Sequence, residues 1–186
     1  MKILNNYKLN IILFATILIS VSCSNDQDDS PELINEEEVI TTVVLTINST
    51  DNPTQTIRWS VDQDNSQEAI RLKSNTEYQV AISFLDETDP SDIEDITEEV
   101  IEEADEHQVF YSFSNISVNY SSGTTDTVDS NGNPVYINSL WTATTIGSGT
   151  VQVFLIHEPV TKTSTTRNGF GGETDVAIDI PISILD

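Results

Sequence analysis

Hydrophobic and polar residues alternate with a period of two along most of this 186-residue chain. The clearest run is DVAIDIPISIL, in which every second residue from Val176 to Ile184 is aliphatic. Strict alternation is typical of a half-buried antiparallel strand. Further runs of this kind are VVLTIN, YQVAISF, VFYSF, ISVNY, VYINSLWTATT and TVQVFLIH, with weaker ones at TIRWSVD and AIRLK.

These strands predict an all-β fold. Their short lengths and the turn sequences between them, such as SNGNP, GSG and NGFGG, favour an antiparallel β-sandwich of about eight strands, with a barrel as the alternative. Pro181 cannot donate to a strand ladder. We therefore expect the last strand to lie at an edge of its sheet or to be bulged at Pro181.

One segment, DPSDIEDITEEVIEEADEHQ, breaks the alternation. Pro90 suits the first turn of a helix, and Ser91 and Glu94 have the spacing of a capping box. On a helix its hydrophobic residues share one stripe: Ile93, Ile96, Val100 and Ala104. The sequence predicts one amphipathic helix packed on the sandwich.

The first 22 residues have the order of a secretory signal. Lys2 and Lys8 precede a nine-residue apolar run, which is too short to span a hydrocarbon core of about 30 Å. The sequence before Cys23 resembles a relaxed bacterial lipobox, with Ser20 in place of the usual leucine. The resemblance implies that Cys23 carries acyl chains that anchor the protein in a membrane, whereas an ordinary signal peptide is the alternative.

We therefore expect three parts: a lipoprotein signal peptide at 1–22, the lipidated cysteine with a flexible acidic linker at 23–35, and one β-sandwich domain at 36–186. The segment SNDQDDS after Cys23 resembles the acidic export signal of Bacteroidota surface lipoproteins. This likeness implies an outer-membrane protein displayed on the cell surface. A solvated tether on the periplasmic face is the alternative.

The chain is strongly acidic, with a formal net charge of −24. We expect no nucleic-acid binding, because such binding depends on Lys and Arg side chains that neutralise phosphates. Between Lys73 and Lys162 there is no Lys or Arg, and there are sixteen Asp or Glu. Such a field attracts cations or a basic partner surface.

The two histidines are the candidate metal ligands. A helical count places His107 on the hydrophobic stripe of the predicted helix, and His157 closes the strand TVQVFLIH on its inner face. Glu103 lies four residues before His107, a spacing at which two helical side chains can share an ion. We predict a site for zinc or another divalent transition metal at Glu103, His107 and His157, joined by Glu106 or Glu158. Two unrelated histidines, each hydrogen-bonded at a strand end, are the alternative.

A calcium loop is a weaker candidate. The segment DQDNSQE places carboxylates and a hydroxyl at alternate positions: Asp62, Asp64, Ser66 and Glu68. Gln67 and Lys73 stand where an EF-type loop needs glycine and glutamate, so a plain turn is the competing interpretation.

Two further motifs bear on chemistry. Thr127 in the tripeptide DTV resembles the O-glycosylation acceptor of Bacteroidota, with an unmodified exposed loop as the alternative. The chain has no G-x-S-x-G nucleophile motif, and Cys23 is expected to be lipidated, so we expect no enzymatic activity. Paired carboxylates leave a carbohydrate-active enzyme as the third functional interpretation.

The segments NEEEVITT, EEADEHQVFYSF, GSGTVQVFLIHEP and GGETDVAIDIPISI resemble a group of Bacteroidota outer-membrane lipoproteins without assigned activity. The resemblance implies that His107 and the His157–Glu158 pair belong to recurrent segments of that group. Members sometimes carry the label of a type 1 periplasmic binding fold, which implies βαβ units in two lobes, whereas the strand pattern here predicts a sandwich.

We expect a lipid-anchored outer-membrane binding protein that captures a metal ion or metal-containing nutrient alongside a TonB-dependent transporter. A structural or adhesive surface module without a small ligand is the main alternative.

Overall fold

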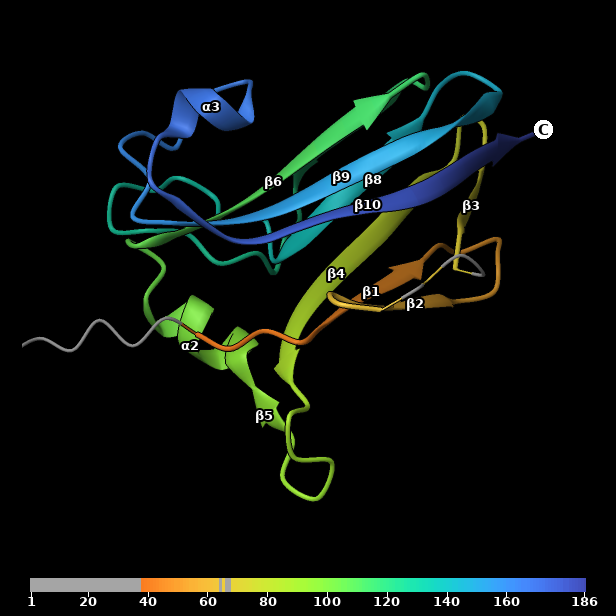
Figure 1. Ribbon diagram of the computed structural model, residues 1–186. Coiled ribbons are helices and arrows are strands. Elements are labelled where there is room, and N and C mark those ends of the chain that lie inside the picture. Colours follow the sequence, from red (N-terminus) through yellow and green to blue (C-terminus); the bar gives the residue numbers. More distant parts are fainter. Residues whose placement is uncertain (1–37, 64, 66–67) are drawn as a thin grey trace, which may run out of the picture. The chain divides into compact units, whose positions relative to one another are not determined.

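The computed structural model describes residues 38–63, 65 and 68–186 (Figure 1). The expected signal peptide, Cys23, the whole expected linker and residues 36 and 37 of the expected domain lie outside the described residues. So do Asp64 and Ser66 of the candidate calcium loop. Within the described part, no helix is long and apolar enough to cross a membrane.

The described residues form two sheets and two short helices. The elements are β1 (Thr42–Asn48), β2 (Gln55–Ser60), β3 (Ile70–Lys73), β4 (Glu77–Asp86), β5 (Glu94–Asp95), α2 (Ile96–Glu102), β6 (His107–Ser114), β7 (Val118–Ser122), β8 (Asn138–Ala143), β9 (Gly147–His157), α3 (Arg167–Phe170) and β10 (Glu173–Leu185).

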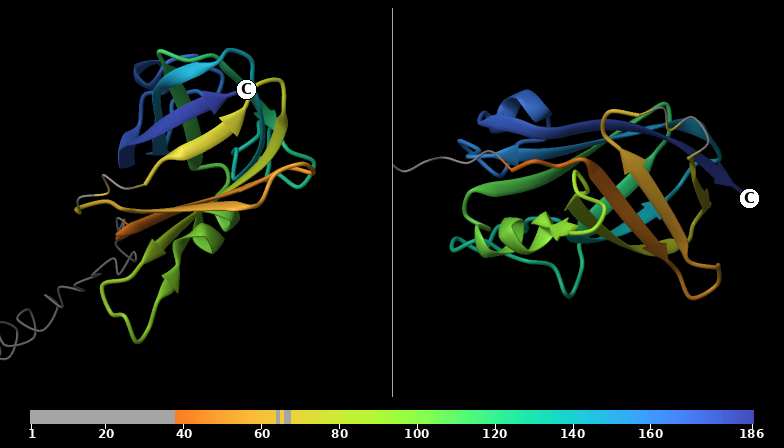
Figure 2. Two further views of the ribbon diagram at one scale, coloured as in Figure 1. Left: turned by 90° about the vertical axis from the view of Figure 1, so that its right-hand side faces the viewer. Right: turned by 60° about the horizontal axis from the view of Figure 1, so that its bottom comes forward.

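The two sheets confirm the predicted β-sandwich. One has the strand order β2-β1-β4-β8-β7, with β5 paired to β4, and the other has the order β3-β10-β9-β6. Figure 2 shows them as two layers. Neighbouring strands are antiparallel, except that β3 runs parallel to β10.

The alternating side chains meet between the sheets in one hydrophobic core. From β4, Tyr78 and Phe84 are buried at 1% and 0% exposure, and from β10 the aliphatic series ends at Ile184, 1% exposed. Trp141 on β8 is fully buried among them. The period-two pattern thus identifies the face of each strand that is buried in the core. Burial of this apolar surface is the main contribution to stability.

The predicted helix is much shorter than expected. Asp89 accepts a hydrogen bond from the main-chain N–H of Ser91 (2.9 Å), so Pro90 and Ser91 lie in a turn and the expected capping box is wrong. Helix α2 begins at Ile96, with Asp95 as its N-cap accepting from the N–H of Thr97 at 3.1 Å. Only Ile96 and Val100 of the predicted stripe are buried, while Ile93 is 52% exposed.

Strand β10 is not an edge strand, contrary to the prediction from Pro181. It pairs with β9 over its whole length and with β3 from Ile182 onward. Pro181 therefore lies one residue before the β3 ladder begins, where a missing N–H breaks no pairing. The irregularity of β10 is elsewhere, between Thr174 and Val176.

Candidate metal centre

His107 and His157 lie side by side. His107 is the first residue of β6 and His157 the last of β9, and the two are directly opposite in the antiparallel register. Directly opposed residues have Cβ atoms about 4.5–5.5 Å apart on the same face. Their rings accordingly stack, with centroids 4.9 Å apart and planes 7° apart. The structure thus brings the two histidines together, but through a strand pair: the expectation that His107 lies on the helix is wrong, because α2 ends at Glu102.

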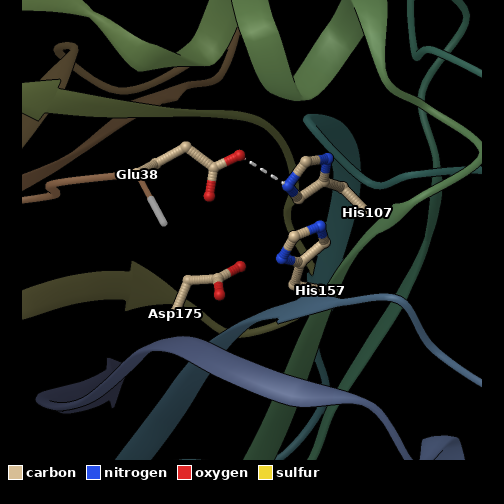
Figure 3. Close-up of side chains that lie close together, drawn as sticks. All are labelled: Glu38, His107, His157 and Asp175. Carbon is tan, nitrogen blue, oxygen red and sulfur yellow. Dashed lines mark ion pairs between the residues drawn. The ribbon is translucent and has the colours of Figure 1, made fainter. Parts of the chain in front are cut away.

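Two carboxylates face this histidine pair. Figure 3 shows Glu38, from the segment before β1, pointing toward His107, and Asp175, from β10, pointing toward His157. The Glu38 Oε1 atom lies 3.0 Å from Nε2 of His107, and the Glu38 side chain is only 5% exposed. One nitrogen or oxygen atom from each of these four residues lies within 4.8 Å of the others. We call Glu38, His107, His157 and Asp175 the four-residue cluster.

A β-bulge directs Asp175 into the cluster. Thr174 pairs with Ile156 and Val176 with Leu155, so Asp175 is an extra residue without a partner on β9. Without the bulge, the alternation that buries Val176 would place the Asp175 side chain on the outer face of the sheet. Bulges commonly re-aim a side chain in this way.

The turn before β10 fixes the start of that strand. Gly172 has a φ of 65°, and a Cβ at this position would lie 2.2 Å from the main-chain oxygen of His157. Arg167 donates hydrogen bonds to the main-chain oxygens of Gly171 and Glu173, both at 2.9 Å. The glycine-rich NGFGG segment therefore brings β10 close to the end of β9, where His157 lies.

The protonation of His107 follows from its surroundings. Its Nδ1 atom lies 3.2 Å from the main-chain oxygen of Glu103, which can only accept, so Nδ1 carries the proton. In a neutral ring the lone pair of Nε2 then faces the Glu38 carboxylate. Two acceptors at 3.0 Å need a proton or a cation between them.

The carboxylates are poorly satisfied. Among the described residues, Glu38 Oε2 and Asp175 Oδ2 are buried without a hydrogen-bond partner, and the contact of His107 Nε2 with Glu38 lacks hydrogen-bond geometry. Burial, and then repulsion from Glu38, raise the pKa of Asp175 to about 6, although both histidines act in the opposite direction. Buried polar atoms normally have hydrogen-bond partners, so a cluster in which several such atoms lack a partner needs an explanation.

The acids named from the sequence surround the cluster. The carboxylates of Glu103 and Glu106 lie 4.0 Å from His107 Nδ1 and 3.9 Å from His157 Nε2. Their side chains are 45% and 58% exposed. Glu106, His157 and Glu158 form a second close group, and Glu38, Glu99 and Glu103 form a third. Burial, and then Glu38 and Glu103, raise the pKa of Glu99.

The sequence did not reveal Glu38 or Asp175. Glu38 is one of three consecutive glutamates beside the expected linker, and Asp175 is the first residue of the run DVAIDIPISIL, whose period of two places it on the face opposite Val176. The glycine pair that ends three residues before Asp175, followed by a strict alternation, was the available signal for a bulge.

The remaining candidates have other surroundings. Asp62 and Glu68 join none of the close acid and histidine groups of the described residues. The main-chain oxygen of Thr127 accepts from the N–H of Val135 at 2.9 Å, and the residue is half-buried. The neighbouring Asp126 accepts from the N–H groups of Tyr136 and Asn138 at 3.1 and 3.0 Å, so it holds the β7–β8 loop.

No family model, curated protein or solved structure matches this chain. The class of protein that the described residues define is therefore a β-sandwich with a buried histidine–carboxylate cluster, and the family resemblance stays an expectation.

Proposed function

We propose that this protein is a lipid-anchored outer-membrane binding protein that captures a divalent transition metal ion, with zinc as the best candidate. The supporting observation is the four-residue cluster, in which two stacked buried histidines face two carboxylates that each have one buried oxygen atom without a hydrogen-bond partner.

The donor set suits zinc better than calcium. Zinc binds imidazole nitrogen and carboxylate oxygen in tetrahedral sites, whereas calcium takes six to eight oxygens. In a tetrahedral zinc site with bonds of about 2.0–2.2 Å, neighbouring ligand atoms are roughly 3.3–3.6 Å apart. The 3.0 Å contact of His107 with Glu38 is close to that spacing. All the ligand atoms lie within 4.8 Å of one another, so no pair has to close by more than about 1.5 Å on binding.

A cation also resolves the electrostatics of the cluster. Two ionised carboxylates, each with a buried oxygen atom, place a charge of about −2 in the cluster, which is unfavourable away from water. A divalent ion would neutralise that charge and satisfy Glu38 Oε2 and Asp175 Oδ2 at once. Glu103, Glu106 and Glu158 at the rim would raise the local concentration of cations.

The burial of the cluster favours a bare ion as cargo. The exposed fractions of His107 and His157 are 0% and 5%, which leaves little room for a bulky metal chelate. Delivery to a TonB-dependent outer-membrane transporter is part of the proposal and is supported by the resemblance of the mature chain to Bacteroidota surface lipoproteins. Cross-linking in intact cells followed by identification of the attached receptor tests that part.

The competing function is a structural surface module. In that case a proton shared between His107 and Glu38 would satisfy the 3.0 Å contact, and no ion would be bound. Metal titration separates the two.

The test is calorimetric titration of the full chain in detergent with zinc chloride, after removal of metals with a chelator. We expect one zinc ion per chain with a Kd in the micromolar range or below. His107→Ala and His157→Ala should each weaken binding at least 100-fold, while Glu158→Gln, at the exposed rim, should change it less than threefold. Circular dichroism checks that each variant is folded.

Absence of heat for the wild-type chain would leave the structural module as the better explanation. If folded His157→Ala bound zinc as tightly as the wild type, the four-residue cluster would not be the zinc site.

A further inference from the structure

An open groove of about 510 Å³ lies between the free edges of the two sheets. Strand β6 ends one sheet and β7 ends the other, and the groove is lined by residues of both strands and of three loops. Four aromatic residues and two hydroxyl residues carry the argument: Tyr111, Phe113, Tyr120, Tyr136, Ser164 and Thr165.

Among the residues that the structure describes, no charged side chain lines this groove, although the chain contains 31 Asp or Glu. A groove without basic residues in a protein of net charge −24 disfavours anionic ligands. A groove without acids offers nothing to a cationic ligand either. The electrostatics therefore select a neutral ligand.

The aromatic rings are held in fixed positions. Tyr120 stands nearly edge-on to Tyr111, with centroids 5.3 Å apart, and to Tyr136, at 5.2 Å. Tyr111 is 2% exposed and supports the other rings from below, whereas Tyr120 and Tyr136 are half-buried and keep part of their surface for a further partner. Phe113 packs edge-on against buried Trp141, at 5.1 Å.

Tyr136 has an unusual backbone conformation. Its φ is 67°, which is rare for a bulky residue and costs conformational energy. Two hydrogen bonds hold it there: its N–H donates to Asp126 at 3.1 Å, and its main-chain oxygen accepts from the hydroxyl of Tyr111 at 3.2 Å. Strained residues that are held in this way are concentrated at functional sites.

We propose that this groove binds a neutral oligosaccharide. The C–H faces of sugar rings stack on aromatic rings, and sugar hydroxyls pair with the hydroxyls of Ser112 and Thr165. The Ser164 hydroxyl already donates to the main-chain oxygen of Thr166 at 2.8 Å and accepts from its N–H at 3.1 Å, so it fixes the loop that carries Thr165. Pockets of this size are typical of small-ligand sites, with a few polar groups that orient the ligand.

This site is independent of the proposed metal site. Phe113 is six residues from His107 along β6, or about 20 Å at roughly 3.3 Å per residue. Sugar binding should therefore be the same in chelator and in saturating zinc, so failure of one proposal is distinguishable from failure of the other.

The test is native electrophoresis of the full chain in detergent, through gels that contain one polysaccharide each. The neutral probes are dextran, galactomannan, xyloglucan and mixed-linkage glucan, and the acidic probe is polygalacturonate. We expect at least one neutral probe to retard the protein, with no retardation by the acidic one. Tyr136→Ala should weaken the retardation at least tenfold.

Two controls make the result specific. Trp59→Ala removes a half-buried aromatic residue on β2, outside the groove, and should leave the retardation unchanged. Tyr136→Phe keeps the ring and should retain most of the binding. Thermal unfolding confirms that each variant is folded.

Three results would overturn the proposal: no retardation by any neutral probe, equal retardation of folded Tyr136→Ala, or retardation by polygalacturonate alone. A fourth would be a dimer in light scattering that Tyr136→Ala dissociates, because a second copy of the chain would then occupy the groove.

Discussion

Asp175 is an energetically costly residue at its position in the metal-free protein. Its carboxylate shares a largely buried cluster with Glu38, one of its oxygens has no hydrogen-bond partner among the described residues, and its pKa is raised to about 6 by burial and by Glu38. At neutral pH it is nevertheless ionised for the most part, so it destabilises the fold. A residue that is unfavourable without a ligand and favourable with one is what a binding site requires.

Replacing Asp175 by Asn should therefore have opposite effects on stability and on binding. In chelator, we expect the free energy of unfolding to rise by roughly 1 kcal/mol, less than the full pKa shift implies, because solvent screens a half-exposed carboxylate. Zinc affinity should fall at least tenfold. Urea denaturation and calorimetric titration measure the two quantities.

The matched control is Asp179→Asn, four residues along β10 on the exposed face, which should change neither quantity appreciably. If Asp175→Asn were less stable than the wild type in chelator, the orphan carboxylate would be a structural group. If it bound zinc as tightly, Asp175 would not be a ligand.

At the scale of elements, the turn between α3 and β10 depends on its glycines. Gly172→Ala would force a Cβ against the main-chain oxygens of His157 and Glu158, at 2.2 and 2.7 Å, in a backbone conformation with a φ of 65°. We expect a loss of roughly 2–4 kcal/mol in the free energy of unfolding, from strain and displacement of β10. Urea denaturation measures it.

Gly132→Ala separates the two causes of that loss. Gly132 has a similar φ of 84°, but nothing lies within 4 Å of a Cβ there. Its substitution should cost only the conformational strain, about 1 kcal/mol. Equal losses at the two positions would mean that the contact with the end of β9 does not constrain the turn.

The elements show what the sequence could predict. The alternating runs predicted the strands of the sandwich, because burial of one face in an antiparallel sheet imposes period two. The helix was predicted too long, because the carboxylate of Asp89 competes for the backbone around Ser91 and forms a turn there. The parallel pairing of β3 with β10 joins segments about a hundred residues apart, and no local pattern encodes it.

The same limits apply to the candidate centre. His107 and His157 could be named because the chain has two histidines. A helical count wrongly placed His107 on the stripe of the predicted helix, whereas His157 closes the alternating run TVQVFLIH. Their acidic partners could not be named, because a bulge and a segment from outside the sheets bring Asp175 and Glu38 to them. The choice of Glu103, Glu106 and Glu158 followed proximity in sequence, whereas the register of the sheets determines proximity in space.

At the scale of the whole molecule, repulsion among acids dominates the electrostatics. The net charge is −24, and the Lys and Arg ion pairs of the described residues are Arg58–Glu87 and Lys162–Asp129, the latter at 3.6 Å. Burial would raise the pKa of Asp129, but hydrogen bonds from Asn133 and Asn131 and the charge of Lys162 outweigh it and lower that pKa. Two such ion pairs cannot offset the repulsion among the many acidic side chains of the surface.

We therefore expect salt to stabilise the protein. Raising sodium chloride from 0.01 to 0.1 M shortens the Debye length from about 30 to about 10 Å, which screens distant repulsion more than close ion pairs. The Tm in chelator should rise by several degrees, as measured by differential scanning calorimetry. A fall in Tm would mean that ion pairs, rather than repulsion, dominate.

The same measurement distinguishes a diffuse acidic field from a defined centre. At constant ionic strength and without chelator, magnesium should act on the field alone and raise the Tm equally in the wild type and in His107→Ala. Zinc should add a stabilisation that depends on its concentration over its Kd, about 2.7 kcal/mol at 100 times the Kd, and only in the wild type. If zinc and magnesium raised the Tm alike in both proteins, the acids would be attracting cations without a centre to hold them, and the capture proposal would fail.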